Sequence, residues 1–298
     1  MNDVAPMTEV RLPNGLDIVC QSPTEALFFY EDLFEKQVYF RNGITLPEDA
    51  CVFDVGSNIG MFMLSVHFLC VRPRLFCFEP APPLYRILDE NRRRHGVDAT
   101  LHNFGISDEE TTASFTFYPQ SSGMSSFHGD LDEERQVLRS LMENQRDHGM
   151  PGMEAVMKHA DDLLEARLQS TALTCQLRRL SDVIAEHGIS TIDLLKIDVQ
   201  KCEMEVLHGL SEEDWPKIKQ IVVEVHDTEG RVEAMNALLH ERGYRVLAEQ
   251  DTLYEGTGIY NLYAHRPLSS SASAATAAAA RLARRKARNR THQRRPHS

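Results

Sequence analysis

The sequence has little cysteine, and none of it is spaced for a metal site. Only six of the 298 residues are cysteines, at positions 20, 51, 70, 77, 175 and 202, and no two form a Cys-x-x-Cys pair. No cysteine stands near histidines at the spacing of a zinc ligand set, which excludes a structural zinc domain. Cys51 and Cys77 lie in apolar stretches, where a thiol behaves as a small core side chain.

A long hydrophobic segment is also missing. The most apolar stretch, residues 61–71, is interrupted by Ser65 and His67 and is too short to span a bilayer. The first eleven residues carry Asp3 and Glu9 where a secretory signal peptide has its apolar core. Together with the unpaired cysteines, these features predict a cytoplasmic protein that has no membrane partner.

Positive charge is scarce over most of the chain and is concentrated at its end. The formal net charge is −12; from Pro267 onward there are eight basic residues and no acidic one. Residues 1–266 therefore hold 24 basic and 44 acidic side chains, and this acidic body argues against a nucleic-acid-binding core. The basic tail has no interleaved aromatic residues for base stacking, which predicts no specific nucleic-acid partner. Two alternatives stay open for the tail: a solvated extension, or a segment that docks on an acidic protein partner.

Strand-like and helix-like segments alternate between residues 48 and 266. Strands are predicted at 51–56, 74–80, 99–107, 114–118, 192–199 and 221–227, with a final hairpin at 244–249 and 259–266. Helices are predicted at 59–69, 84–95, 180–187 and 232–242. Strands separated by helices of this length predict an α/β fold with a doubly wound, mostly parallel sheet.

Three further segments flank or interrupt this domain. Residues 1–47 contain an apolar run, 26–34, which predicts an N-terminal helical cap. Residues 119–175 are rich in methionine and acid, with helical spacing and no strand signal; a helical lid over the site and a surface helix pair with a small core are both open. Residues 267–298 are rich in serine and alanine and then in arginine, which predicts a disordered basic tail.

The strongest local signal is Phe53-Asp-Val-Gly-Ser-Asn-Ile-Gly60, where a buried strand is followed by a helix. Its glycines let a ligand approach the backbone, and the N-terminus of the helix exposes N–H groups. The pattern G-x-x-x-G lacks the dinucleotide fingerprint G-x-G-x-x-G and the lysine of a P-loop, which disfavours a pyrophosphate. A ligand with an ammonium group and a ribose fits better, with Asp54 facing the cation and Glu79 accepting the ribose hydroxyls. A turn that serves packing alone is the alternative.

Four segments in this order resemble one family: FDVGSNIGMF, CFEPAPPLY, HNFGISD and LLKIDVQKCEMEVLHGL. They resemble the FkbM family of S-adenosylmethionine (SAM)-dependent methyltransferases, over about residues 25–265. The EVHD segment and the insertion resemble the branch associated with polyketide and nonribosomal-peptide pathways. The resemblance implies the class I methyltransferase fold, Rossmann-like, with an antiparallel last strand.

The resemblance also implies a cofactor and its site. The cofactor is SAM, and the implied binding residues are Asp54, Gly56, Ser57, Asn58, Gly60, Glu79 and Pro80, with the adenine near Asn103 and Phe104. The chain departs from the family in one place, because the family commonly reads Asp-Val-Glu-Gly-x-Glu after its fourth strand. Here Gln200 and Lys201 replace the first glutamate and the glycine, while Asp198 and Glu203 are kept.

Methyl transfer from a sulfonium needs alignment of donor and acceptor and a group that takes a proton. His226 is the predicted catalytic base, because an imidazole titrates near neutral pH, and Asp198 is its predicted helper. A hydrogen-bonded structural histidine and an Asp198 that only caps a helix are the alternatives. Asp198 with Glu224 or Asp227 also permits a Mg²⁺ or Ca²⁺ site, so a divalent metal stays open and is not predicted.

These observations together predict a SAM-dependent O-methyltransferase. Its predicted acceptor is a hydroxyl of a small natural product or of a carrier-bound biosynthetic intermediate, and transfer to nitrogen or carbon stays open. Two other classes also stay open. One is an NAD(P)-dependent oxidoreductase on a similar sheet, which the missing fingerprint disfavours. The other is a non-catalytic SAM-binding interaction protein, which the departure at Lys201 permits.

Overall fold

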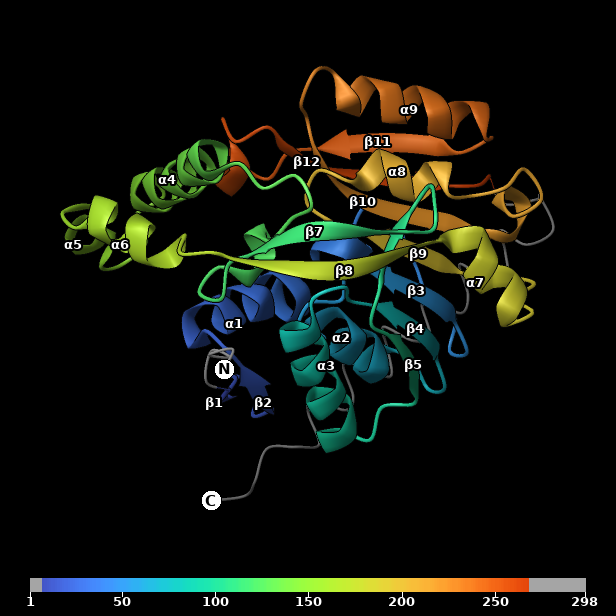
Figure 1. The fold of residues 1–298 in the computed structure, drawn as a ribbon, viewed down its shortest axis with the longest axis horizontal. Helices are drawn as coiled ribbons and strands as arrows, with labels where there is room; N and C mark the ends of the chain where they lie inside the picture. The colour runs from blue at the N-terminus through green and yellow to red at the C-terminus, as the bar shows by residue number, and fades with distance from the viewer. Residues whose placement is uncertain (1–6, 268–298) are drawn as a thin grey trace. The chain divides into compact units, whose positions relative to one another are not determined.

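A seven-stranded sheet is the centre of the computed structural model, which describes residues 7–267 (Figure 1). Its strand order is β11-β12-β10-β9-β3-β4-β5. The strands are β3 (Cys51–Val55), β4 (Arg74–Phe78), β5 (Ala99–His102), β9 (Leu194–Ile197), β10 (Gln220–His226), β11 (Arg245–Glu249) and β12 (Ile259–His265). Strand β12 is antiparallel to β10 and β11, and the pairs from β10 to β5 are parallel. The predicted doubly wound, mostly parallel α/β sheet with an antiparallel last strand is confirmed.

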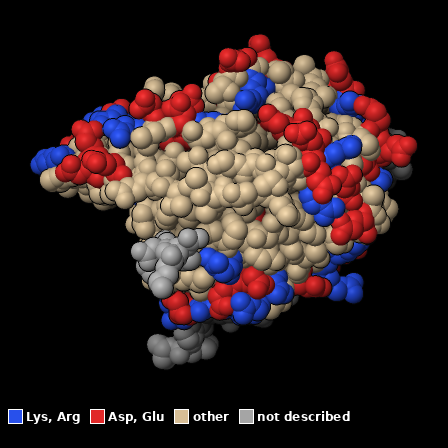
Figure 2. All heavy atoms as spheres, viewed as in Figure 1, with Lys and Arg blue, Asp and Glu red and all other residues tan. Residues whose placement is uncertain are grey.

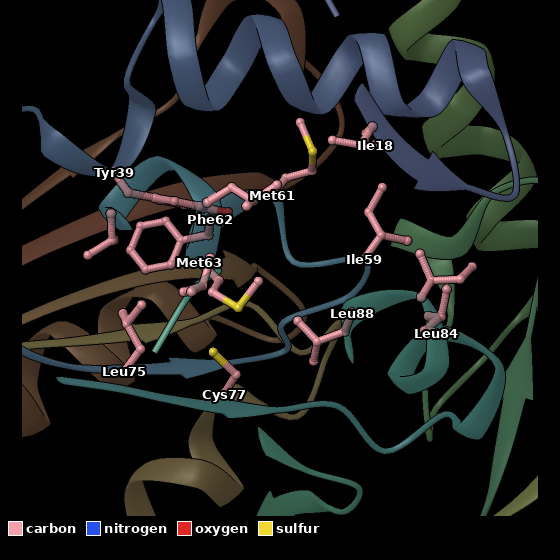
Figure 3. Close-up of a cluster of buried hydrophobic side chains, with 14 of the residues drawn as sticks. Ile18, Tyr39, Ile59, Met61, Phe62, Met63, Leu75, Cys77, Leu84 and Leu88 are labelled. Atoms are coloured by element: carbon pink, nitrogen blue, oxygen red, sulfur yellow. The ribbon is translucent and has the colours of Figure 1, made fainter. Parts of the chain in front are cut away.

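Helices cover both faces of this sheet, because successive side chains along each strand point to opposite faces. One face is covered by α2 (Met61–Leu69) and α3 (Pro82–Arg94), and the other by α7 (Leu180–Glu186), α8 (Glu203–His208) and α9 (Arg231–Glu241). On the first face, Met63 of α2 and Leu88 of α3 converge on Leu75 and Cys77 of β4 (Figure 3). On the second face, the neighbouring residues Phe76 and Phe78 pack with the other three helices.

The first 47 residues differ from the predicted helical cap. They begin with a hairpin of β1 (Thr8–Arg11) and β2 (Asp17–Cys20), and the helical part follows as α1 (Pro23–Tyr30), a π-helical turn (Glu31–Glu35) and a 3-10 turn (Val38–Phe40). The pair Asn14-Gly15 lies in the hairpin loop, and Gly15 has a φ of 88° that favours glycine. An Asn-Gly pair between two short alternating segments is the sequence signal for this hairpin.

A second, three-stranded sheet has the order β6-β8-β7. Its strands are β6 (Gly105–Ser107), β7 (Thr111–Phe117) and β8 (Thr171–Arg179). The predicted single strand 99–107 is therefore two strands in two sheets, and β8 begins inside the segment for which no strand was expected. The reason is tertiary: β8 is central in its sheet, parallel to β6 and antiparallel to β7, and neither partner is close in sequence. The uncharged centre of the face in Figure 2 lies over β7 and β8, whose exposed side chains are mainly Thr and Ser.

The insertion between β7 and β8 is largely helical. It contains a 3-10 turn (Ser122–Met124) and the helices α4 (Leu131–Asp147), α5 (Met153–Met157) and α6 (Ala160–Arg167), which lie together in Figure 1. These helices share a small apolar cluster that includes Leu138, Met142, Met153 and Leu164. None of the helices between residues 7 and 267 is both long and apolar enough to cross a membrane. The predicted basic tail, 267–298, lies outside the described residues except for Pro267.

Candidate functional site

A cavity of about 300 Å³ lies at the carboxyl ends of the parallel strands. Its wall is formed by the loops after β3, β4 and β9, by side chains of β10 and β12, and by residues of α1, α4 and the 3-10 turn Ser122–Met124. This is the edge at which doubly wound sheets bind ligands. Six of the residues predicted for the site line the cavity: Gly56, Ser57, Asn58, Glu79, Pro80 and Asp198.

The turn after β3 is held in place by its own short contacts. Gly56 has a φ of 82°, and a Cβ there would overlap the carbonyl oxygen of Asp198, so only glycine fits. The Ser57 hydroxyl donates to the carbonyl of Asp54 at 2.8 Å and accepts from the N–H of Phe78 at 3.1 Å. The loop thus presents its backbone to the cavity in one fixed conformation.

Gly60, a predicted cofactor residue, lies at the start of α2. It does not line the cavity; its φ is 88°, and a Cβ there would come within 2.7 Å of Leu88. Glycine at this position therefore permits the close packing of α2 against α3.

Glu79 is buried, at 4% exposure, and faces the cavity just after β4. One carboxylate oxygen accepts from the N–H of Asn58 at 2.8 Å, and the other accepts from the N–H of Ala81 at 2.9 Å. Burial raises the pKa of Glu79 to about 7, although the two N–H donors act in the opposite direction. Each oxygen keeps a further lone pair, so the carboxylate fits two hydroxyl donors such as those of a ribose.

Asp54 does not face the cavity, contrary to the prediction. Its side chain is fully buried and forms an ion pair with the ammonium group of Lys196 on β9, at 3.1 Å. Lys196 lines the cavity, donates to the carbonyl of Gly56 at 2.7 Å and lies 3.6 Å from Asp198. Burial alone would lower the pKa of Lys196, but Asp54 and Asp198 raise it above its usual value. Asp54 therefore pairs with the ammonium group of Lys196, and that ammonium group supports the turn after β3.

Lys196 is a charged residue of the cavity wall for which the sequence predicts no role. The signal for it was available, because a lysine inside the apolar strand Leu194–Ile197 needs a buried partner. The register of the sheet supplies that partner, since Lys196 stands directly opposite Asp54 on β3.

Asn103 and Phe104 also lie away from the cavity. The amide of Asn103 donates to the carbonyls of Glu79 at 2.9 Å and Pro80 at 3.1 Å, and so fixes the loop that carries the carboxylate. Phe104 is buried against Phe78, at 5.9 Å between ring centroids. The residues of this segment that line the cavity are the next two, Gly105 and Ile106.

Asp198 and His226 do not form the predicted pair. The hydroxyl of Tyr39 donates to Asp198 at 3.0 Å, and Gln200 donates to the other carboxylate oxygen at 3.1 Å. His226 instead contacts Glu203 through Nδ1 at 2.8 Å, is 6% exposed and does not line the cavity. Asp198 therefore lines the cavity, and the imidazole of His226 does not lie beside it.

Two further polar side chains line the cavity beyond Asp198, and neither was assigned a catalytic role from the sequence. They are Glu224 on β10 and Asn261 on β12, which stand directly opposite each other in the antiparallel pair. Only the three-dimensional structure shows which residue of β12 stands opposite Glu224 of β10. Among the residues from 7 to 267, no three Asp, Glu, His or Cys side chains gather as a metal site, so these carboxylates are not arranged as a ligand set.

The insertion is fastened to the loop that follows Asp198. The ammonium group of Lys201 lies 2.6 Å from Glu133 and 3.3 Å from Glu134, both on α4. Ser126 donates to the carbonyl of Gln200 at 2.5 Å. Gln200 and Lys201 have φ values of 53° and 75°, so the position where the family commonly has glycine keeps a left-handed backbone here.

A second attachment joins the insertion to α1 and to the turn after β3. The Ser122 hydroxyl donates to Glu25 at 2.7 Å, and the Asn58 amide donates to Ser122 at 3.0 Å. Glu25 also accepts from the N–H of Gly123 at 2.9 Å. One serine therefore connects the insertion, the N-terminal helix and the turn that carries the predicted cofactor residues.

Comparison with known proteins identifies the family of this site. The family model of the methyltransferase FkbM domain matches residues 54–246. The chain is 41% identical over 268 residues to the 31-O-demethyl-FK506 methyltransferase FkbM of Streptomyces tacrolimicus. The aligned region covers 89% of this chain and 99% of that protein. It is 30% identical over 242 residues to the methyltransferase sdnD of Sordaria araneosa, over 77% of this chain and 86% of sdnD.

A third relative is much longer. The chain is 41% identical over 289 residues to the AMB antimetabolite synthetase AmbE of Pseudomonas aeruginosa, which covers 94% of this chain but spans only 13% of AmbE. The family model covers the turn after β3, the strands from β4 to β10, and the cavity-lining residues Glu79, Asp198 and Glu224. The chain belongs to the FkbM family of methyltransferases.

Proposed function

We propose that the protein transfers a methyl group from SAM to a hydroxyl of a small natural product, free or attached to a carrier. The observation that carries this proposal is one cavity that joins Glu79, just after β4, to Asp198, just after β9, and to Glu224 on β10. Family membership makes the chain a methyltransferase, so the oxidoreductase alternative is set aside. The name of the FkbM relative, a 31-O-demethyl-FK506 methyltransferase, supports the choice of a hydroxyl acceptor.

The residues of the turn fit SAM. Glu79 would accept the ribose hydroxyls, the backbone of Gly56, Ser57 and Asn58 would contact the nucleoside, and Asp198 would accept the ammonium group in place of Asp54. When bound, SAM supplies a methyl group that its sulfonium makes electrophilic. The chain itself has to align the acceptor, exclude water and take one proton.

The insertion acts as a lid in this proposal. Leu138, Leu141 and Met142 of α4 line the cavity, and Leu138 and Met142 also belong to the apolar cluster of the insertion. The two interpretations of this segment are therefore compatible: its helices have a small core of their own, and one of them covers the site. Covering a site in this way keeps water from the reacting groups.

The test of the cofactor assignment is calorimetric titration of SAM into wild type and Glu79→Gln. Glutamine keeps the shape but loses the charge, and hydrogen bonds to a charged group are worth about 1.5–3 kcal/mol, so we expect affinity to fall roughly 10- to 100-fold. Glu109→Gln, an exposed residue of the β6–β7 turn, is the matched control and should bind as wild type does. Equal affinity in both variants would contradict the placement of the ribose.

The raised pKa of Glu79 gives a second expectation for the same measurement. Below about pH 7 the carboxyl is protonated and offers one acceptor fewer to a ribose, whereas above it both oxygens accept. Affinity for SAM should therefore rise between pH 5.5 and pH 7.5 and then level off. Glu79→Gln should remove this rise, and a rise of the same size in that variant would assign the pH dependence to another group.

A further inference from the structure

Tyr39 brings the N-terminal segment into the cavity wall. It lies in the 3-10 turn Val38–Phe40, is 5% exposed and lines the cavity. Its hydroxyl donates to Oδ2 of Asp198 at 3.0 Å, across 159 positions of sequence. The family model begins at residue 54, so Tyr39 lies outside the part of the chain that the model matches. A residue from outside that part therefore contacts the carboxylate to which the ammonium group of SAM is assigned.

The side chain of Tyr39 is held in place by several contacts. Its ring packs edge-on against Phe62 of α2, with 5.6 Å between the ring centroids (Figure 3). The ammonium group of Lys196 lies 5.6 Å from the centre of the same ring, which favours a cation at its face. The hydroxyl of Tyr263 on β12 donates to the carbonyl of Val38, the preceding residue, at 2.7 Å. The phenol of Tyr39 therefore has little freedom to turn away from its partner.

The carboxylate of Asp198 accepts a hydrogen bond on each oxygen. Tyr39 donates to Oδ2, and the amide of Gln200 donates to Oδ1 at 3.1 Å. Lys196 lies 3.6 Å from Oδ2, which is longer than an N–H···O hydrogen bond, and its shorter contacts are with β3 and the turn after it. The two donors therefore fix the plane of the carboxylate, and the side chain stays 26% exposed in the cavity wall.

Loss of the Tyr39 hydroxyl would let this carboxylate close its ion pair with Lys196. Opposite charges attract strongly where little water separates them, and the side chain of Lys196 is only 3% exposed. An aspartate oxygen that moves to hydrogen-bond distance of Lys196 has one lone pair fewer for a ligand. Because the phenol hydroxyl occupies Oδ2, it keeps Asp198 available to the cavity.

The charge states of the neighbouring groups agree with this arrangement. Burial raises the pKa of Tyr39 well above its usual value, and Asp198 raises it further, so the phenol keeps its proton near neutral pH and donates it. Glu224 also lines the cavity, but burial raises its pKa well above the usual value and Asp198 adds to the increase. Since these surroundings favour an uncharged Glu224, Asp198 is the better partner for an ammonium group.

We propose that Tyr39 is a positioning residue for the amino-acid end of the cofactor. Its hydroxyl holds the carboxylate of Asp198 in the orientation in which it accepts the ammonium group of SAM. No covalent bond changes in this role, and binding of the adenine and the ribose does not depend on it. The proposal rests on the proposed function and extends the cofactor site to a segment that the family model does not match.

The experiment compares two nucleosides that differ at the amino-acid end. S-adenosylhomocysteine carries the ammonium and carboxylate groups, whereas 5′-methylthioadenosine has the same adenine, ribose and sulfur without them. Both are titrated calorimetrically into wild type and Tyr39→Phe. We expect Tyr39→Phe to bind S-adenosylhomocysteine roughly tenfold more weakly, the scale of one lost hydrogen bond to a charged group. It should bind 5′-methylthioadenosine as wild type does, which also shows that the variant is folded.

Tyr30→Phe is the matched control. Tyr30 lies in the same segment at the end of α1, is 8% exposed and does not line the cavity. This variant should bind both ligands as wild type does. Glu79→Gln gives the opposite pattern and should weaken both ligands alike, because both contain the ribose.

A double variant shows whether Tyr39 acts through Asp198. In Asp198→Ala the preference for S-adenosylhomocysteine should already be lost, so the addition of Tyr39→Phe should change either affinity by less than about twofold. A second loss as large as the first would mean that the hydroxyl contacts the ligand directly, and would overturn the positioning role. Equal weakening of both ligands by Tyr39→Phe alone would overturn it too, because a purely structural role affects the whole cavity.

Binding by wild type separates this proposal from the proposed function. If wild type binds neither nucleoside, the cofactor assignment itself fails. If it binds both with the same affinity, or if Tyr39→Phe binds both as wild type does, the role given to Tyr39 is wrong and the assignment of the nucleoside end stands.

Discussion

At the scale of single residues, Lys196 and its two aspartates decide the electrostatics of the site. Lys196 is 3% exposed and its partner Asp54 is fully buried, so neither charge is stabilised by water. The ammonium group also lies 5.6 Å from the ring of Tyr39 and 5.8 Å from the ring of Phe62, which favour a cation at their faces. The turn that presents Gly56 thus depends on one buried charge pair.

Replacement of this lysine should therefore cost far more stability than that of a surface lysine. Lys196→Met leaves Asp54 buried without its cation, and breaking a buried pair in this way costs about 3–5 kcal/mol. Combining it with Asp54→Asn should recover a large part of the loss. Urea unfolding of the single and double variants measures both effects.

The control for this experiment is Lys219→Met. Lys219 also pairs with an aspartate, Asp193, but is 59% exposed, so its loss should cost about 1 kcal/mol or less. Losses that are equal for the two lysines would show that burial of the pair with Asp54 contributes nothing.

The site residues that could be predicted from the sequence are those whose role depends on neighbours in the chain. Gly56, Ser57, Asn58 and Glu79 belong to one strand–turn–helix unit and to the end of the next strand, and the structure brings all four to the cavity. The strand that contains Asp54 is predicted correctly, but its ion-pair partner Lys196 lies 142 residues further along the chain. No spacing in the sequence indicates which strand lies next to it.

At the scale of elements, the loop between β9 and α8 carries a strained connection to the insertion. Lys201 adopts a φ of 75°, where a residue with a Cβ costs about 1–2 kcal/mol relative to glycine. Its side chain compensates by pairing with Glu133 and Glu134, and Glu134 is 1% exposed. Lys201, where the family commonly has glycine, therefore strains the backbone but adds ion pairs to α4.

Two substitutions separate the strain from the link. Lys201→Ala removes the ion pairs and keeps the strain, whereas Lys201→Gly removes both, so the glycine variant should be more stable by about 1 kcal/mol. Both should increase amide hydrogen exchange in α4 (Leu131–Asp147). Lys158→Ala, at an exposed position of the insertion, should change neither quantity. An alanine variant as stable as the glycine variant would show that the backbone at Lys201 is not strained.

The strands and helices that the sequence predicts are those with a local hydrophobic pattern. A strand that exists because a distant strand pairs with it is not predicted. The strands of the parallel sheet are short apolar runs followed by helices, and they overlap the residue ranges predicted for them. Strand β8 exists because β6 and β7 pair with it on both sides, and the break after His102 exists because β5 and β6 belong to different sheets. Both facts depend on register across the molecule, which local periodicity does not encode.

At the scale of the whole described chain, three apolar clusters have very different sizes. Two large clusters lie on the two faces of the seven-stranded sheet, and the third belongs to α4, α5, α6 and the strand end before them. A small cluster that contacts the body through a few polar links opens at a lower free energy than the main core. The links include those of Lys201, Ser122 and Ser126 described above. They also include Asn144, whose amide donates to the carbonyls of Leu253 and Glu255 at 2.9 Å.

We therefore expect the insertion to open as a unit before the sheet unfolds. Leu164 is fully buried in the small cluster, and Leu164→Ala should cost about 2–5 kcal/mol of local stability. Native-state hydrogen exchange should then show faster exchange in α4 and α6 and unchanged protection in β3 and β9. Leu163→Ala, where the side chain is 40% exposed, is the matched control and should leave both regions unchanged. Because α4 lines the cavity, SAM should also dissociate faster from Leu164→Ala than from the control. Loss of protection in β3 and β9 to the same degree would mean that the lid and the sheet form one cooperative unit.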